Sequence, residues 1–237
     1  MALPRLNDIP QYELVIPSSG ETVNYRPFLV KEQKVLLIAY ESKDQRQIIN
    51  AIMNCIASCL QEDIDVSKLS TFDADYIFTK IRSKSVGEKI TVTAKCEECE
   101  HRSDAEIDLE KIQLLGDTKP SNIKITNEID LKMKYPSYRD FISNEKLMAE
   151  EMSTASVFEM LTSCIESVMT EEENISLKDE PKEEIERFIN SLTGEQFATV
   201  RGFVESMPKI ILDFEFTCEA CNKVNQHRLE GLQDFFS

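Results

Sequence analysis

Four of the seven cysteines form two copies of one motif, in which two thiols are separated by two residues. The copies are CEEC at residues 96–99 and CEAC at residues 218–221. One CxxC motif alone could be a redox pair, half of a metal site or an accident. Two sulfurs at this spacing can face one metal ion at about 2.3 Å, which supplies half of a tetrahedron. The two copies therefore predict one shared metal site with four ligands: Cys96, Cys99, Cys218 and Cys221.

The metal expected at this site is a single zinc ion, because tetrahedral sites made only of thiolates suit zinc. Iron would also accept four sulfurs, and the sequence leaves the choice between the two metals open. Four protein ligands close the coordination sphere, so the site is predicted to be structural, with no position for a reacting water. Redox catalysis fits poorly, since carboxylates beside the sulfurs disfavour the thiolate and neither motif begins a helix.

The other cysteines and the two histidines are predicted to have different roles. Cys59 and Cys164 fall on apolar helical stripes and Cys55 lies beside the first stripe, so we expect three buried core residues. His101 and His227 lie two and six residues beyond the nearest motif, so they are not equivalent in the two copies. We expect both to be polar hairpin residues rather than ligands.

The elements that must position the two motifs follow one order in both halves of the chain. Thr193 with Gln196 forms a capping box, and Ser70 with Asp73 a weaker one, so a helix is predicted to start at each place. An alternating strand follows each helix, KITVTA in one half and IILDFEF in the other, and leads into the CxxC turn and a second strand. Each motif is therefore predicted to lie at the tip of a β-hairpin.

The similarity between the halves extends upstream. NAIMNCIASCL and FEMLTSCIESV each predict an amphipathic helix, whose face in the second case runs from Val157 to Val168. YELVIPSSGETVNYRPF and IKITNEIDLKMKYPSY each predict two short strands. Amphipathic helices share a period, so the upstream match could be partly coincidental. We predict an α+β fold made of two similar halves by internal duplication, at residues 8–115 and 120–237, joined at a zinc-ribbon-like four-cysteine site.

An acidic insertion near residues 170–190 interrupts the second half. It contains PKEEIERFI, where a proline at the helix start and acidic residues in the first turn predict a short extra helix. The insertion is interpreted either as a contact for a partner or as a solvated loop.

Composition argues against several classes of function. The net charge of −16 disfavours binding to nucleic acid or to anionic membranes. No apolar run approaches the ~20 residues of a membrane span, and the first residues lack a secretory signal, so we expect a cytosolic protein without membrane association. With 2 histidines, 6 glycines and no catalytic motif, the chain predicts no catalytic residue, no small-molecule substrate and no enzyme activity.

The stretch YELVIPSSGETVNYRPFLVKEQKVLL, followed by paired CxxC turns, resembles the baseplate hub protein family of T-even-type bacteriophages. The resemblance implies a non-enzymatic structural or assembly protein of a contractile-tail baseplate hub. Its partners would be other baseplate hub proteins or the tape-measure protein. The protein would act in the host cytoplasm during assembly, and it would either stay in the virion tail baseplate or serve as an assembly factor.

Two other functions are alternatives to the baseplate hub hypothesis. A zinc-ribbon adaptor could bind nucleic acid or transcription machinery, although the net charge of −16 disfavours it. A thiol enzyme is the second competitor, and reduction of insulin would reveal it.

Overall fold

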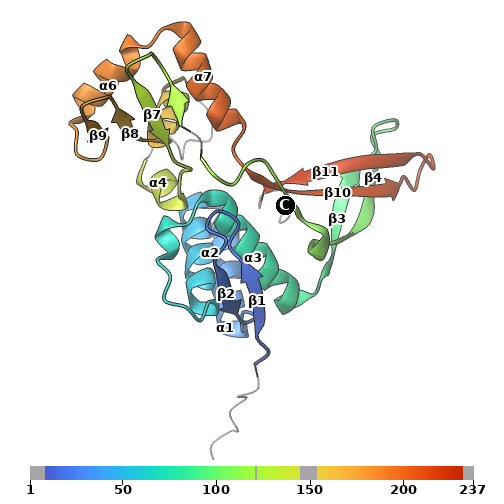
Figure 1. Ribbon diagram of the computed structural model, residues 1–237. Coiled ribbons are helices and arrows are strands. Elements are labelled where there is room, and N and C mark those ends of the chain that lie inside the picture. The colour runs from blue at the N-terminus through green and yellow to red at the C-terminus, as the bar shows by residue number, and fades with distance from the viewer. Residues whose placement is uncertain (1–8, 121, 145–153, 232–237) are drawn as a thin grey trace, which may run out of the picture. The chain divides into compact units, whose positions relative to one another are not determined.

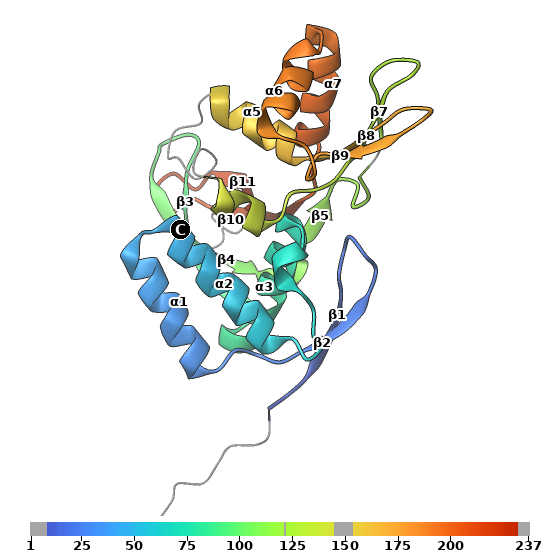
Figure 2. The ribbon, with the colours of Figure 1, turned by 90° about the vertical axis from the view of Figure 1, so that its left-hand side faces the viewer.

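The computed structural model describes residues 9–120, 122–144 and 154–231 (Figures 1 and 2). The fold is α+β, with seven α-helices and short antiparallel strands among these residues. The chain divides into two compact units: Met1–Val66 with Phe72–Leu115 and Lys209–Ser237, and Ser67–Thr71 with Gly116–Pro208. No described helix combines the length and the apolar character that crossing a membrane requires.

Three helices and a small sheet form the N-terminal part of the first unit. The helices are α1 (Val30–Ser42), α2 (Gln45–Cys59) and α3 (Thr71–Val86), with a 3-10 turn at Val66–Lys68 before α3. The sheet pairs β1 (Tyr12–Val15) antiparallel with β2 (Thr22–Tyr25), as predicted for this segment. α1 packs on α2, and the largest fully buried side chains of α2 and α3 are apolar: Ile56, Ile77, Phe78 and Ile81.

Two further strand pairs complete the first unit. The first is β3 (Lys89–Lys95) with β4 (Arg102–Asp108), and the second is β10 (Lys209–Thr217) with β11 (Val224–Glu230). A 3-10 turn at Leu109–Lys111 follows β4, and β5 (Gln113–Leu115) then pairs with β10 to give the order β11-β10-β5. The C-terminal strands therefore belong to the same unit as the N-terminal helices.

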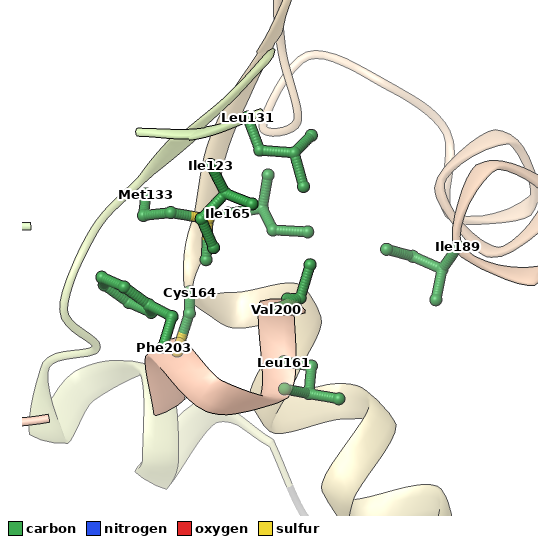
Figure 3. Packing of buried hydrophobic residues seen from close by; sticks show 9 residues of the cluster. All are labelled: Ile123, Leu131, Met133, Leu161, Cys164, Ile165, Ile189, Val200 and Phe203. Atoms are coloured by element: carbon green, nitrogen blue, oxygen red, sulfur yellow. The ribbon is translucent and has the colours of Figure 1, made fainter. Parts of the chain in front are cut away.

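The second unit packs helices against a four-stranded antiparallel sheet. The strands, in sheet order, are β6 (Ile123–Lys124), β7 (Asp130–Met133), β8 (Ile165–Met169) and β9 (Asn174–Ser176). The helices are α4 (Tyr138–Ser143), α5 (Thr154–Ser163), α6 (Lys182–Ser191) and α7 (Gly194–Glu205). Buried side chains from the sheet, α5, α6 and α7 converge on one core (Figure 3): Ile123, Leu131, Met133, Leu161, Cys164, Ile165, Ile189, Val200 and Phe203.

The helix predicted from Val157 to Val168 is shorter than expected. α5 ends at Ser163, and β8 begins at Ile165 in the middle of the sheet. Ile165 and Val168 fit the helical stripe, but both are β-branched residues, which favour strands. They are three positions apart, and a bulge in the β7–β8 pairing lets both contact the same core. Pairing with both β7 and β9 decides the outcome, because it satisfies the backbone of β8 on both edges.

The acidic insertion contains the predicted extra helix. α6 begins after Pro181, with Glu183 and Glu184 in its first turn. The segment also contributes to the packed structure, since β9 pairs with β8 and Ile189 of α6 is buried in the core. The helix therefore starts at the proline and the acidic residues that predicted it. The insertion is more than a solvated loop.

The three cysteines predicted to be core residues are buried: Cys55, Cys59 and Cys164 are exposed by 3%, 0% and 0%. Burial raises the pKa of the Cys164 thiol to about 11, so this thiol stays protonated at neutral pH. These cysteines therefore act as small apolar residues.

Thr193→Ala should destabilise the start of α7. The Thr193 hydroxyl accepts a hydrogen bond from the Gln196 N–H at 3.3 Å, and the Gln196 carboxamide oxygen accepts one from the Thr193 N–H at 2.8 Å, so the predicted capping box is present. We expect the free energy of unfolding to fall by about 1 kcal/mol. Thr199→Ala is the matched control, because its exposed hydroxyl donates within the helix, to the Glu195 carbonyl. If urea unfolding showed the same decrease in the free energy of unfolding for both variants, the capping role of Thr193 would be contradicted.

Candidate metal centre

The four cysteines of the CxxC motifs lie in two turns of the first unit. Cys96 and Cys99 lie between β3 and β4, whose pairing ends at Lys95 opposite Arg102. Cys218 and Cys221 lie between β10 and β11, which remain paired up to Thr217. Each strand pair thus carries its two thiols just beyond the last paired residues.

The two turns have the same backbone conformation. Glu100 and Asn222, each next to the second cysteine of its motif, both have φ of 61°, in the left-handed region. Their N–H groups donate to the carbonyl oxygens of Cys96 and Cys218, at 3.0 and 2.9 Å. The N–H of each first cysteine in turn donates to the carbonyl five residues on, at 2.8 and 2.9 Å. These bonds fold each CxxC segment so that both of its sulfurs reach the same side.

The sulfur atoms of the two turns meet in one cluster, with all four within 4.8 Å of one another. Cys96 Sγ lies 3.6 Å from Cys221 Sγ, and Cys99 Sγ lies 3.5 Å from Cys218 Sγ. These separations far exceed a disulfide bond of about 2.05 Å. A tetrahedron with metal–sulfur bonds of about 2.3 Å has edges of about 3.8 Å. The cluster thus has the size and the donor set that a tetrahedral metal ion requires.

Backbone N–H groups and neighbouring thiols shift the pKa values of the four cysteines in different directions. The Cys99 N–H lowers the pKa of Cys96 to about 6, and the Cys221 N–H in the same way lowers the pKa of Cys218. The His101 N–H acts to lower the pKa of Cys99, but the Cys221 thiol, desolvation and the other two thiols outweigh it and raise that pKa to about 12. Four adjacent thiolates repel one another unless a cation lies between them. A divalent metal would remove this conflict.

Two buried polar residues cross-link the turns in a reciprocal pattern. The Asn225 side-chain oxygen accepts a hydrogen bond from the Glu97 N–H at 3.1 Å, and the Ser103 hydroxyl accepts one from the Glu219 N–H at 3.2 Å. Asn225 and Ser103 are 1% and 2% exposed, and each lies four residues beyond the second cysteine of its own motif. Neither residue was predicted to support the site, although a polar residue at the same place in both copies was an available signal.

Asn225→Ala should weaken metal binding without removing a ligand. It deprives the Glu97 N–H of its acceptor, and loss of such an outer hydrogen bond typically costs about 10–100-fold in metal affinity. Gln226→Ala is the control, because its exposed amide donates to Glu215 at 2.6 Å, away from the cysteines. Competition for zinc with a chromophoric chelator measures both variants. Equal affinities would show that the reciprocal bonds do not support the site.

Apolar packing between the strand pairs supports the turns. Ala94 of β3, Ala105 of β4 and Phe216 of β10 are buried in one small cluster. The His227 ring lies edge-on against Phe216 with ring centroids 5.1 Å apart, while His101 is exposed. Neither histidine belongs to the four-sulfur cluster, so neither is a candidate ligand there.

A family model described as T4 bacteriophage base plate protein matches residues 9–237. The chain therefore belongs to this family of phage baseplate proteins, which confirms the resemblance found in the sequence. The chain is also similar to the baseplate hub assembly protein gp26 of Enterobacteria phage T4. The two are 22% identical over 228 residues, which cover 95% of this chain and 98% of the relative. No solved structure matches the chain.

Proposed function

We propose that this protein is a non-enzymatic structural or assembly component of a contractile-tail baseplate hub, stabilised by one structural zinc ion. The observation that carries the proposal is the relationship to a hub assembly protein over 95% of this chain and 98% of the relative. Similarity over nearly the full length of both chains favours a shared role in assembly over a single shared module. The adaptor function considered above is not favoured, since the family is one of baseplate proteins.

The proposed zinc ligands are Cys96, Cys99, Cys218 and Cys221. Support comes from their mutual approach within 4.8 Å and from the equivalent backbone of the two turns. When bound, zinc would supply a positive charge that holds four thiolates together, and four thiolates leave it no open position for catalysis. The reciprocal bonds of Asn225 and Ser103 would orient the turns around it.

We also propose that the chain arose by internal duplication, with halves at residues 8–115 and 120–237. The order of elements supports this, because β1, β2, α2, α3 and the β3–β4 pair correspond to β6, β7, α5, α7 and the β10–β11 pair. β9 and α6 then lie in the acidic insertion of the second half, and β8 directly precedes it. The equivalent positions of Ser103 and Asn225 relative to their motifs support the same conclusion.

The proposed partners are other baseplate hub proteins or the tape-measure protein, met in the host cytoplasm during tail assembly. Deleting the gene from its phage and supplying the protein from a plasmid tests this role. We expect the deletion to abolish complete baseplates in electron micrographs and the wild-type plasmid to restore them. Normal baseplates without the protein would refute the proposal. Mass spectrometry of purified virions then decides whether the protein stays in the particle or acts only during assembly.

A further inference from the structure

Helix α1 carries apolar residues on more of its circumference than its contact with α2 covers. Leu36 and Ala39 are buried on the side that packs in the first unit. Four large apolar side chains on other sides are more than half exposed: Val30 at 79%, Val35 at 51%, Leu37 at 56% and Ile38 at 54%. A helix that is apolar on opposite sides normally has both sides covered by protein.

The exposed apolar residues are concentrated rather than scattered. Nine large apolar side chains are exposed in the described part of the chain, and five of them lie between Leu29 and Ile38. Isolated exposed apolar residues need no explanation, but a contiguous group on one helix marks an interaction surface. We call the surface formed by Val30, Lys31, Lys34, Val35, Leu37 and Ile38 the α1 patch.

A groove between α1 and α2 adjoins the α1 patch. It has a volume of about 280 Å³, and its walls combine apolar Val35, Ala51 and Cys55 with polar Lys31, Glu32, Asn54 and Ser58. A concave site with apolar side chains in its walls, beside a row of exposed apolar residues, is typical of surfaces that receive an amphipathic helix. The groove could take one large side chain while the rest of the partner helix lies on the α1 patch.

The charges around the α1 patch are opposite in sign to those of the whole protein. Exposed Lys31, Lys34, Lys43 and Arg46 outnumber the exposed Glu41 and Asp44, whereas the chain as a whole has a net charge of −16. The remaining acid, Glu32, is buried and paired with Arg26 at 2.9 Å and with Lys31 at 3.3 Å, which leaves the other three basic side chains to set the sign. A symmetric dimer through this patch would bring the same lysines together, so a second copy is a poor occupant.

We propose that the α1 patch docks an amphipathic helix of another baseplate hub protein, with an apolar stripe flanked by carboxylates. The proposal rests on the proposed function only for the class of the partner. The apolar residues would supply the buried area, and the lysines would fix orientation and speed association with an acidic surface. Affinity should therefore depend on the apolar side chains at any salt concentration, and on the lysines chiefly at low salt.

The probes for this proposal are the central hub protein and the tape-measure protein of the same phage, each purified and titrated against the full chain by calorimetry. Leu37→Asp combined with Ile38→Asp should lower the affinity for one of them by about tenfold or more. Lys34→Glu should lower it by about threefold at low salt and have little effect at about 0.5 M salt. Val86→Asp is the matched control, since Val86 is 57% exposed but lies at the end of α3.

The outcomes separate this inference from the proposed function. Binding that is lost in the α1 double variant and kept in the Val86 control supports the α1 patch as the docking surface. Binding that all variants share overturns the inference and leaves the hub role intact. If neither probe binds the wild-type chain, the docking inference fails, and the gene-deletion experiment still decides the hub role. A wild-type dimer that the double variant separates in sedimentation would overturn the inference in favour of self-association.

Discussion

Cys218→Ser is expected to abolish stoichiometric zinc binding and to unfold much of the first unit. Cys218 is fully buried, and its sulfur lies 3.5 Å from that of Cys99 in the four-sulfur cluster. Three remaining thiolates hold zinc more weakly, and structural zinc contributes on the order of 10 kcal/mol to the folding of small domains. We therefore expect the free energy of unfolding of the first unit to fall by roughly 5 kcal/mol. Elemental mass spectrometry and chemical unfolding, monitored by circular dichroism, measure the two effects.

Cys164→Ser is the matched control for this experiment. Cys164 is equally buried, but it lies in the core of the second unit and outside the sulfur cluster. Burying a hydroxyl among these apolar side chains should lower the free energy of unfolding by about 1–3 kcal/mol. The zinc content should stay at the wild-type level. Equal zinc content in the Cys218 and Cys164 variants would contradict the ligand assignment. If the wild-type protein contained iron, the assignment of the four ligands would stand, and the bound metal would be iron instead of zinc.

Leu131→Ala is expected to destabilise the second unit by about 2–5 kcal/mol, since it removes a fully buried side chain and leaves a cavity. Leu131 lies on β7, paired on one side with β6 and on the other with β8, where the backbone cannot easily collapse into the space. The zinc content should not change, because all four proposed ligands belong to the first unit. Urea unfolding of the variant, combined with metal analysis, tests both statements.

The same substitution at an exposed position provides the control for Leu131. Leu37 is 56% exposed, so Leu37→Ala should cost less than about 0.5 kcal/mol. If Leu131→Ala also released zinc, the two compact units would not be independent in stability. The division of the chain at Leu115 and Pro208 would then reflect the pattern of contacts, and the two units would not unfold separately.

Local chemistry explains which parts of the fold could be predicted. The capping box at Thr193 and the Pro181 start of α6 depend on residues within one turn, and both helices begin there. The repeated CxxC spacing predicted a cluster of four cysteines, and the structure brings their sulfurs together across more than 100 residues. Their role as metal ligands stays a prediction.

Features that depend on tertiary contacts were not predictable in the same way. A helical stripe ran through Ile165, but pairing with two neighbouring strands makes this residue part of β8. Helix α1 escaped prediction because its apolar residues surround the helix instead of forming one stripe. Asn225 has no sequence signature of its own, and its role follows from a hydrogen bond to a residue 128 positions away.

The distance in sequence between the paired thiols has a consequence for synthesis. Cys96 and Cys221 are 125 residues apart, so the ribosome produces the first CxxC motif well before the second. A nascent chain that has reached Pro208 presents one CxxC motif, and two thiols do not make a tetrahedral site. At the proposed site, tight capture of zinc would therefore wait until translation has passed Cys221, and it would separate polypeptides that contain both motifs from those that stop between them.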